Sequence, residues 1–444
     1  MAMPGAESER PEEISLDDLR DAWPLLSEED RSEGFRMLPR AAAEEFLLGS
    51  SSRDQASLIL GLPDGERQKW MRLIPPDDIA DLLQELPERR DELMSVLDAQ
   101  TKKEVTALMA YAEDEAGGLM NPRYVRLRPD MSMDEAISYL RKQARQHLET
   151  VYYLYVLGEG QRLLGVVSLR ELLKAQADKK VRDVMRTDLV SVPEDRDQEE
   201  VGRLFALHDL VAIPVLDAEG RMKGIVTVDD IVDVVHEEAT EDIQKFGGMA
   251  ALEAPYLTTR FTSMIKKRAG WLLVLFFGEM LTATAMAHYE HQIASAVVLT
   301  LFIPLIISSG GNTGSQASTL VVRAMALDEV LLRDWWRVMR RELASGVVLG
   351  GILGSLGFLR IVGWQWVTPA YGPHYVRLGL TVGLSLLGVV LFGTVVGSLL
   401  PFLFKRIGFD PASASAPFVA TLVDVTGLVI YFSAAGLLLS GALL

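Results

Sequence analysis

The sequence contains no cysteine among its 444 residues and only six histidines. Without cysteine it offers no disulfide bond, no thiolate zinc site and no thiol nucleophile. It also carries no glycine-rich P-loop motif that would indicate transport driven by ATP hydrolysis. Oxygen-containing side chains are therefore the main candidates for binding a metal ion.

A secretory signal pattern is lacking as well. The first residues do not combine a basic region with an apolar one, and instead include Glu7, Glu9, Glu12 and Glu13. This pattern predicts that no signal peptide is cleaved. We therefore expect the front half of the chain to stay in the cytosol.

Charge is divided unevenly along the chain. Residues 1–260 carry 53 acidic and 32 basic side chains, a net charge of −21, whereas residues 261–444 carry eight acidic and twelve basic ones, a net charge of +4. A single uniform globular fold does not account for this asymmetry. The acidic front half also argues against nucleic acid as a partner, because phosphate binding needs a basic surface.

The back half contains long apolar stretches. A helix needs roughly 20 mostly apolar residues to cross a bilayer. Stretches of this kind follow one another with short polar segments between them, and they predict a membrane domain of about five helices. They cover residues 269–288, 293–323, 343–366, 376–404 and 417–441.

Basic residues predict the orientation of these helices, because short cytoplasmic loops are rich in Lys and Arg. They precede the first span at 266–268, separate the second and third spans at 333–341, and precede the fifth at 405–406. We expect the acidic front half inside the cell and the C-terminus outside. Arg360 and Arg377 are exceptions to this pattern.

The second predicted span contains residues that disfavour a helix. Pro304 is followed at 308–316 by the run SSGGNTGSQ. Unwound backbone at membrane depth is tolerated only where it is buried in protein or lines a water-filled cavity. The run therefore predicts either a break that lines or gates a pore, or a loop at the membrane surface.

Two acidic residues fall inside predicted spans. Asp424 lies in the last span, where a carboxylate costs about 2.5 to 3.5 kcal/mol on insertion scales, so it is expected to face an ion path, a partner or the bundle interior. Hard oxygen ligands suit Mg²⁺ or Ca²⁺. The alternative is an Asp424 that is protonated or paired with a base. Glu279 in the first span could line the same path or be paired near the interface.

Residues 118–240 contain an internal repeat. The segment LGVVSLREL at 164–172 is echoed by KGIVTVDDI at 223–231, and each copy reads as strand, helix, two strands and a closing helix. The arrangement resembles a tandem cystathionine-beta-synthase (CBS) pair. That resemblance implies an adenine-nucleotide site such as one for ATP, with Ser168, Arg170 and Thr227 as contacts. A purely structural module is the alternative.

Residues 15–115 have a helical pattern in which prolines recur. Pro63, Pro75 and Pro87 are each separated by twelve residues, the length of a short helix and a turn. This spacing predicts a stack of short helices without a catalytic signature.

An acidic helix is expected to connect the repeats to the first span. At about 100 degrees per residue, Asp230, Asp233, Glu237 and Glu241 fall on one face, with Glu238 and Asp242 beside it. Such a face is often only solvated. Its position between the two halves makes it the place where a cytoplasmic signal would enter the membrane domain.

The order of these parts resembles the MgtE family of bacterial magnesium channels and transporters. The most specific segments are GGNTGSQ at 310–316, ATLVDVTG at 420–427 and ATEDI at 239–243. The resemblance implies a multidomain membrane protein and no enzyme activity. Its parts are an all-α helical N-domain (1–116), an α/β tandem CBS pair (117–178 and 179–240), a connecting plug helix (229–262) and a five-helix α transmembrane domain (263–444).

The resemblance also implies functional residues. It predicts a homodimer in the inner (plasma) membrane, in contact with lipid, with Asp424 of each chain holding hydrated Mg²⁺ and with Asn312 and Ala420 lining the pore. The predicted sensor ligands for cytoplasmic Mg²⁺ are Asp197, Glu199, the Ala206 carbonyl, Asp209, Asp230, Asp233, Glu238, Glu241, Asp242 and Asp410. Weaker matches in the N-domain are Asp77, Asp81 and Glu45.

These features predict passive Mg²⁺ uptake that cytoplasmic Mg²⁺ closes by bridging carboxylates. A proton- or sodium-coupled divalent cation exchanger is an alternative, with Asp424 and Glu279 as the coupling relay. A CBS-regulated transporter of another substrate, such as an anion, fits less well with Asp424 in the path. A membrane-tethered nucleotide sensor without transport leaves the second span unexplained.

Overall fold

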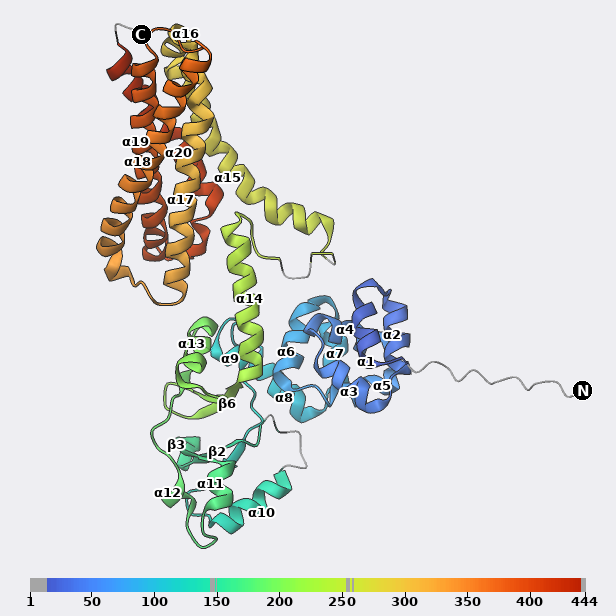
Figure 1. Cartoon of the computed structure of the whole chain (residues 1–444). Coiled ribbons are helices and arrows are strands. Elements are labelled where there is room, and N and C mark those ends of the chain that lie inside the picture. Colours follow the sequence, from blue (N-terminus) through green and yellow to red (C-terminus); the bar gives the residue numbers. More distant parts are fainter. Residues whose placement is uncertain (1–13, 144–147, 149, 253–255, 258, 441–444) are drawn as a thin grey trace, which may run out of the picture. The chain divides into compact units, whose positions relative to one another are not determined.

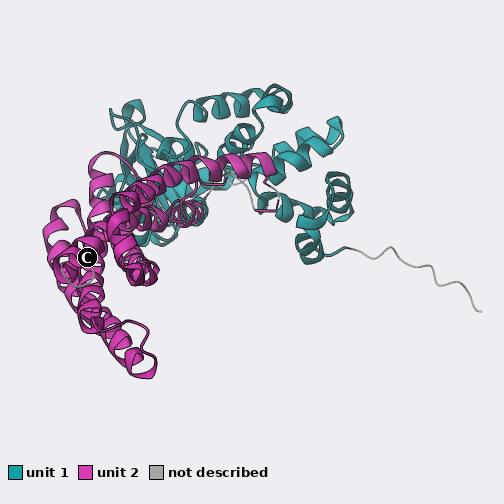
Figure 2. Cartoon of the chain, turned by 90° about the horizontal axis from the view of Figure 1, so that it is seen from above, with its two compact units in different colours: residues 1–236 teal, residues 237–444 magenta. Residues whose placement is uncertain are grey.

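The computed structural model describes residues 14–143, 148, 150–252, 256–257 and 259–440. The chain divides into two compact units, Met1–His236 and Glu237–Leu444, which are coloured separately in Figure 2. The division falls inside helix α14 (Val228–Phe246). Each unit contains its own buried apolar clusters.

The first unit begins with short helices. They are α1 (Leu16–Ala22), α2 (Glu28–Met37), α3 (Arg40–Leu48), α4 (Ser52–Gly61), α5 (Asp64–Met71), α6 (Pro76–Glu85), α7 (Arg90–Val96) and α8 (Ala99–Leu108). As the spacing predicted, Pro63 and Pro75 cap the starts of α5 and α6, and Pro87 opens a 3₁₀ turn. Proline suits these positions because the first helical turn needs no amide donor from it.

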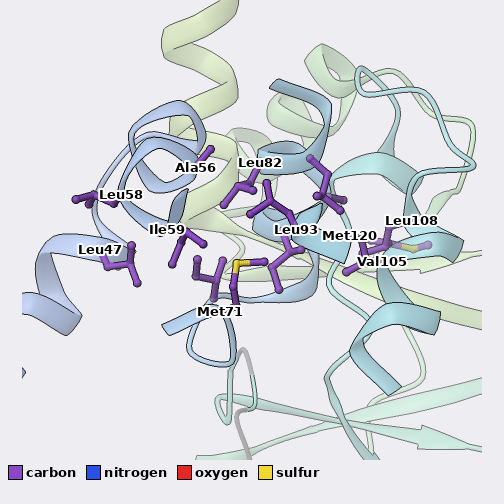
Figure 3. Packing of buried hydrophobic residues seen from close by; sticks show 14 of the residues in the cluster. Leu47, Ala56, Leu58, Ile59, Met71, Leu82, Leu93, Val105, Leu108 and Met120 are labelled. Atoms are coloured by element: carbon purple, nitrogen blue, oxygen red, sulfur yellow. The ribbon is translucent and has the colours of Figure 1, made fainter. Parts of the chain in front are cut away.

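One apolar cluster holds these helices together. Figure 3 shows Ile59, Met71 and Leu93 among the side chains that gather between them. The same cluster continues through Met120 to Phe205 in the second repeat. The helical N-domain and the second repeat therefore share a core, and burial of this shared apolar surface favours their association.

Each repeat has the predicted order of strands and helices (Figure 1). A short helix, α9 (Ala116–Leu119), leads into the first repeat, which contains β1 (Val125–Leu127), α10 (Met133–Gln143), β2 (Tyr153–Leu157), β3 (Leu163–Ser168) and α11 (Leu169–Lys174). The second repeat follows α12 (Val181–Val184) and contains β4 (Val192–Pro193), α13 (Gln198–His208), β5 (Ala212–Leu216), β6 (Met222–Thr227) and α14. In each three-stranded sheet the first pair is parallel and the second antiparallel.

The two repeats also exchange backbone pairing. Asn121, which precedes β1 in the first repeat, forms a bridge with Ile225 on β6. Arg186, which precedes β4 in the second repeat, forms the equivalent bridge with Val166 on β3. Each sheet is therefore completed by a residue that leads into the other repeat.

The second unit is helical. Within the described residues, five helical segments are long and apolar enough to cross a membrane, as predicted. They are α15 (Phe261–His288), Val297–Ala326, Leu332–Val367, α19 (Tyr375–Arg406) and α20 (Ala416–Leu439). The second comprises the 3₁₀ helix η4 (Val297–Phe302) and α17 (Ile303–Ala326); the third comprises η5 (Leu332–Asp334) and α18 (Trp335–Val367); and α16 (Glu290–Ser295) joins the first two.

The predicted break at 308–316 is wrong, because α17 runs through it as a regular helix. Pro304 lies in the first turn of α17, where its missing amide donor is tolerated. Gly310 and Gly314 are buried against the backbone of α19 at Gly393. The small residues in this run therefore allow two helices to pack closely and do not unwind the span.

A second close contact joins α18 and α19. Gly346, Gly350, Gly354 and Gly357 lie along one buried face of α18. A Cβ atom at Gly354 would lie 2.5 Å from the Gly383 carbonyl oxygen of α19. Because real Cβ atoms do not approach backbone this closely, the glycine is required for the observed spacing of the helices.

This contact gives a stability prediction. Gly354→Ala should lower the free energy of unfolding of the purified full-length protein in detergent by about 1 to 3 kcal/mol, and hence its unfolding temperature, because overpacking forces α18 and α19 apart. Gly351→Ala is the matched control, since a Cβ at Gly351 has no atom within 4 Å. Equal unfolding temperatures for the two variants would show that the close approach does not stabilise the membrane unit.

Candidate functional site

The first candidate site in the cytosolic unit lies where α6 meets the start of α14. Asp78 on α6 interacts electrostatically with Asp229 and Asp233, and Asp230 interacts with Asp78. Helices far apart in sequence thus bring acidic side chains of like charge together. Sequence reasoning predicted roles for Asp230 and Asp233 but missed Asp78.

The surroundings of these acids raise the pKa of two of them. Burial raises the pKa of Asp78 to about 6, and the charges of Asp229 and Asp233 add to the rise. Burial also raises the pKa of Asp230 to about 7, with the charges of Asp229 and Asp78 adding to the rise, although hydrogen bonds from Thr227 oppose it. The acids around α14 are therefore costly to ionise together.

Asp77, next to Asp78, has a different setting. It is buried, and its Oδ1 accepts a hydrogen bond of 3.0 Å from the Asn121 side chain. Asp81, one turn further along α6, is exposed. Asp77, Asp78 and Asp81 lie within two turns of α6. Their spacing in the sequence therefore does not indicate which of them faces α14.

The repeated Ser/Thr-x-x-Asp/Glu signature forms helix caps. The Ser168 hydroxyl accepts from the Glu171 amide at 3.2 Å, while Glu171 accepts from the Ser168 amide at 3.0 Å. At α14 the Thr227 hydroxyl donates to Asp230 at 2.7 Å. Ser168 and Thr227, two of the three predicted nucleotide contacts, thus already stabilise a helix start. Arg170 is exposed on α11.

The predicted ligands on α13 occupy its two ends. Asp197 caps the N-terminus and accepts from the Glu199 amide at 2.9 Å, while Glu199 pairs with Arg203 at 2.9 Å. Asp209 follows the C-terminus in a left-handed conformation, and Ala206 lies exposed in the last turn. The two ends of α13 do not bring these residues into one group.

Glu45 lies apart from both α13 and α14. In α3 its carboxylate is 3.7 Å from the Arg20 guanidinium, and its side chain is largely exposed. Glu45 therefore makes an ion pair inside the helical N-domain. Nothing in this pairing connects it to the other predicted ligands.

A second group lies in the other unit, at the C-terminal end of α14. The Lys245 ammonium is 2.7 Å from the Asp410 carboxylate and also pairs with Glu241. Burial alone would lower the pKa of Lys245, but its hydrogen bonds with Asp410 and Glu241 outweigh burial and raise that pKa. Sequence reasoning predicted Glu241 and Asp410 but missed the lysine between them.

Asp410 also organises the start of α20. Its Oδ1 accepts from the Ala412 amide at 2.8 Å, which caps the 3₁₀ helix η6 (Pro411–Ser413) before α20. Near it, the Trp271 indole donates to the Ser415 hydroxyl at 3.2 Å, linking α15 to the same segment. Glu238 and Asp242 are half-buried on α14.

The membrane spans α15, α17 and α20 bring another set together. Asp424 on α20 is half-buried and interacts with Glu279 on α15. Ala420, one turn before Asp424, faces Gly311 of α17, where a Cβ would lie 3.5 Å from the Ala420 Cβ. Asn312, next to Gly311, is exposed and donates to the Ser308 hydroxyl at 3.4 Å.

The predicted ligands are thus distributed over several places. Across the described part of the chain, no three Asp, Glu or His side chains converge tightly enough to enclose a metal ion. The pairs and clusters that do form are Asp78 with the start of α14, Glu241 with Lys245 and Asp410, and Glu279 with Asp424. A hydrated cation needs only one or two direct carboxylate contacts, so pairs of this kind suit Mg²⁺ with its waters.

Family models match most of the chain. The MgtE intracellular N domain matches residues 14–114, and CBS domains match residues 116–178 and 181–237. A model described as the MgtE divalent cation transporter matches residues 303–434. These ranges include α6, both repeats and the spans α17 to α20.

Individual relatives agree with this assignment. A magnesium transporter MgtE from Thermus thermophilus is 41% identical over 96% of this chain and 94% of the relative, and one from Bacillus subtilis is 34% identical over 82% and 79%. A crystal structure of the cytosolic domain of the Mg²⁺ channel MgtE in complex with ATP is 43% identical, with a TM-score of 0.47, over 50% of this chain and 91% of that one. On the family models and the full-length relatives, the chain belongs to the MgtE family of divalent cation transporters.

Proposed function

We propose that this protein carries Mg²⁺ passively into the cytosol through its membrane unit and that cytoplasmic Mg²⁺ closes the path. The observation that carries the proposal is the position of Asp424 within a span, beside Glu279 of another span. The relatives are named magnesium transporters, which supports Mg²⁺ as the substrate. The absence of a P-loop motif from the sequence supports passive movement.

Two neighbouring acids on different spans favour a divalent cation. When both are ionised they repel each other in a medium of low dielectric constant, and a cation of charge +2 converts this repulsion into attraction. Mg²⁺ holds its waters firmly, so Asp424 would contact the hydrated ion through water. We expect the exposed Asn312 amide and the small Ala420 side chain to line the path of such an ion.

The carboxylates of the cytosolic unit supply the closing device. Asp78, Asp229, Asp230 and Asp233 resist being charged together. Mg²⁺ bound among them would relieve this repulsion and hold α6 against α14. Mg²⁺ shifts the equilibrium between the closed arrangement, with α6 against α14, and the open one only by the difference in its affinity for the two.

Helix α14 would couple Mg²⁺ binding in the cytosolic unit to the membrane spans. Asp230 and Asp233 lie at its start, and Lys245 lies at its end in the ion pair with Asp410. Asp410 caps the segment that opens α20, the helix that carries Asp424. A shift of α14 would thus act on α20 through one salt bridge and one helix cap.

Coupled exchange is the second candidate function. The contact between Glu279 and Asp424 favours it, since two neighbouring acids can also relay protons. An opposing proton gradient would drive Mg²⁺ flux in an exchanger and would leave a passive path unaffected. Flux into liposomes with and without that gradient distinguishes the two.

Three further features stay predictions. Assembly as a homodimer rests on the family resemblance, because the exposed apolar side chains of α15, such as Leu273, Phe276 and Phe277, suit contact with lipid as well. An outside C-terminus in a bacterial inner membrane rests on the distribution of basic residues. Nucleotide binding at the repeats has support only in their CBS fold, because Ser168 and Thr227 serve as helix caps.

The transport site can be tested directly. Asp424→Asn should reduce Mg²⁺ flux into liposomes by about tenfold or more, because loss of one charge removes more than 1.4 kcal/mol of attraction for a divalent cation. Glu290→Gln, at an exposed position on α16, is the control and should transport like the wild type. Normal flux through Asp424→Asn would place the ion path elsewhere.

The closing device predicts loss of feedback. A variant with Asp230→Asn, Asp233→Asn and Glu241→Gln should conduct Mg²⁺ but resist inhibition by high internal Mg²⁺. All three substitutions keep side-chain size. The two aspartate changes remove charges that the ion would bridge, and Glu241→Gln removes the carboxylate that pairs with Lys245 at the other end of α14. The measurement is Mg²⁺ flux into proteoliposomes at rising internal Mg²⁺.

A matched triple variant controls for lost charge. Glu159→Gln, Asp178→Asn and Asp188→Asn remove three exposed acids elsewhere in the repeats and should keep normal inhibition. Unchanged inhibition in the α14 variant would rule out the proposed sensor.

Repulsion at Asp78 predicts a stability effect. Asp78→Asn should raise the free energy of unfolding of the full-length protein in EDTA at pH 8 by up to about 3 kcal/mol, seen as a higher unfolding temperature, and should reduce the stabilisation that added Mg²⁺ brings. Folding raises the pKa of this acid from 3.8 to about 6, so the fold binds its proton more tightly than the unfolded chain does. Stability is therefore lost as pH rises from about 4 to 6.

The pH dependence and a control make this prediction specific. The gain from Asp78→Asn should disappear below pH about 4, where the carboxyl is protonated in both states. Asp91→Asn, at an exposed position on α7, should not change stability at either pH. A gain that persists in acid would mean that packing, and not charge, limits stability at Asp78.

A further inference from the structure

A basic cavity lies where the chain enters α18. Its volume is about 520 Å³, and its lining residues are Arg333, Asp334, Trp336, Arg337, Arg340 and Arg341. Neither the Mg²⁺ path nor the closing device uses these residues. The volume falls in the range of small-molecule sites, roughly 300 to 1,000 Å³.

Positive charge dominates this cavity. Asp334 is the acid among its lining residues, and its carboxylate pairs with Arg337 at 2.9 Å and caps the Leu331 amide at 3.2 Å. The Arg337 side chain is 85% exposed despite that pair. Guanidinium groups stay charged at all physiological pH values and bind phosphate through paired donors. The cavity therefore suits a phosphate-containing anion.

The arginines are held on a fixed support. Arg337, Arg340 and Arg341 are spaced by three and four residues, which places them on one side of α18. Val338 packs instead into an apolar cluster with Met325 of α17 and Phe402 of α19. The helix turn that carries the arginines is thus anchored to two neighbouring spans.

The length of α18 places this turn at the level of lipid headgroups. Its 33 residues extend about 50 Å, whereas the hydrocarbon core of a bilayer is about 30 Å thick. Gly346 to Gly357 pack on α19 in the apolar part. Trp335 and Trp336, both about half exposed, stand at the same end as the arginines, and tryptophan is enriched at membrane interfaces.

We propose that this cavity binds the headgroup phosphate of an anionic phospholipid from the cytoplasmic leaflet. Arginines that serve only to orient a span need to be near the interface, but they need not surround one cavity. The exposed indole rings beside the arginines offer apolar contact for the upper acyl chains, which a free phosphate ion cannot use. Clusters of basic residues at the end of a span attract anionic headgroups for the same electrostatic reason.

Native mass spectrometry of the full-length protein can test this site with defined lipids. The wild type should bind phosphatidylglycerol more tightly than phosphatidylcholine. The variant with Arg337→Gln and Arg340→Gln should lose about tenfold or more of its affinity for phosphatidylglycerol and keep its affinity for phosphatidylcholine, because each interfacial arginine contributes to attraction of anionic lipid.

Two controls make the result specific. The double variant Arg360→Gln and Arg377→Gln removes two arginines near the other ends of α18 and α19 and should bind phosphatidylglycerol like the wild type. Arg337→Lys with Arg340→Lys keeps the charge that orients the span and should bind with intermediate affinity, because the paired donors are lost. This lysine variant still tests the site if the glutamine variant does not fold.

Competition with inorganic phosphate identifies the source of the anion. A large excess of phosphate should leave phosphatidylglycerol bound to the wild type, because the acyl chains add apolar contact. Displacement by phosphate alone would overturn the lipid assignment. Undiminished affinity in the glutamine variant, or an equal loss in the Arg360/Arg377 control, would overturn the site itself.

Discussion

Repulsion between neighbouring carboxylates is the constraint on which the proposed function depends. In the cytosolic unit, burial and mutual repulsion raise the pKa of Asp78 and Asp230 toward neutrality. At the end of α14, the ammonium of Lys245 relieves the same repulsion between Glu241 and Asp410. The Lys245 ammonium thus neutralises one acidic pair, whereas in the proposed function the other would be neutralised by Mg²⁺ from solution. On that proposal, α14 has a fixed ion pair at its C-terminal end and an ion-dependent contact at its start.

The scaffold brings these acids together with ordinary packing. A continuous apolar cluster joins the helical N-domain to the second repeat, so α6 is positioned beside the start of α14. In the membrane unit, glycines allow α17, α18 and α19 to approach at backbone distance. Because glycine has no side chain, these helices pack closely and hold fixed positions around α20. Helix α15 contacts the other spans mainly through α20.

Patterns with a strong local cause were predictable from the sequence. Proline spacing indicated the helix starts at Pro63 and Pro75, the internal repeat indicated both sheets, and apolar length indicated the spans. Features set by tertiary contact were not. Glycines near Gly310 looked like helix breakers, but neighbouring helices stabilise α17 through them. Asp78 and Lys245 gain their roles from partners distant in sequence, which no local pattern reveals.

The exchanged pairing of the repeats has a consequence for how the protein is made. Asn121 can pair only after Ile225 on β6 has been synthesised, and Val166 only after Arg186. Neither sheet is therefore complete while only the first repeat has left the ribosome. At bacterial speeds, the roughly 100 residues between Asn121 and Ile225 take on the order of ten seconds to synthesise. During that interval the bridge between Asn121 and β6 cannot form, whereas the first sheet is completed earlier, when Arg186 emerges. The nascent chain therefore matures as a pair of repeats, just before the first apolar span emerges.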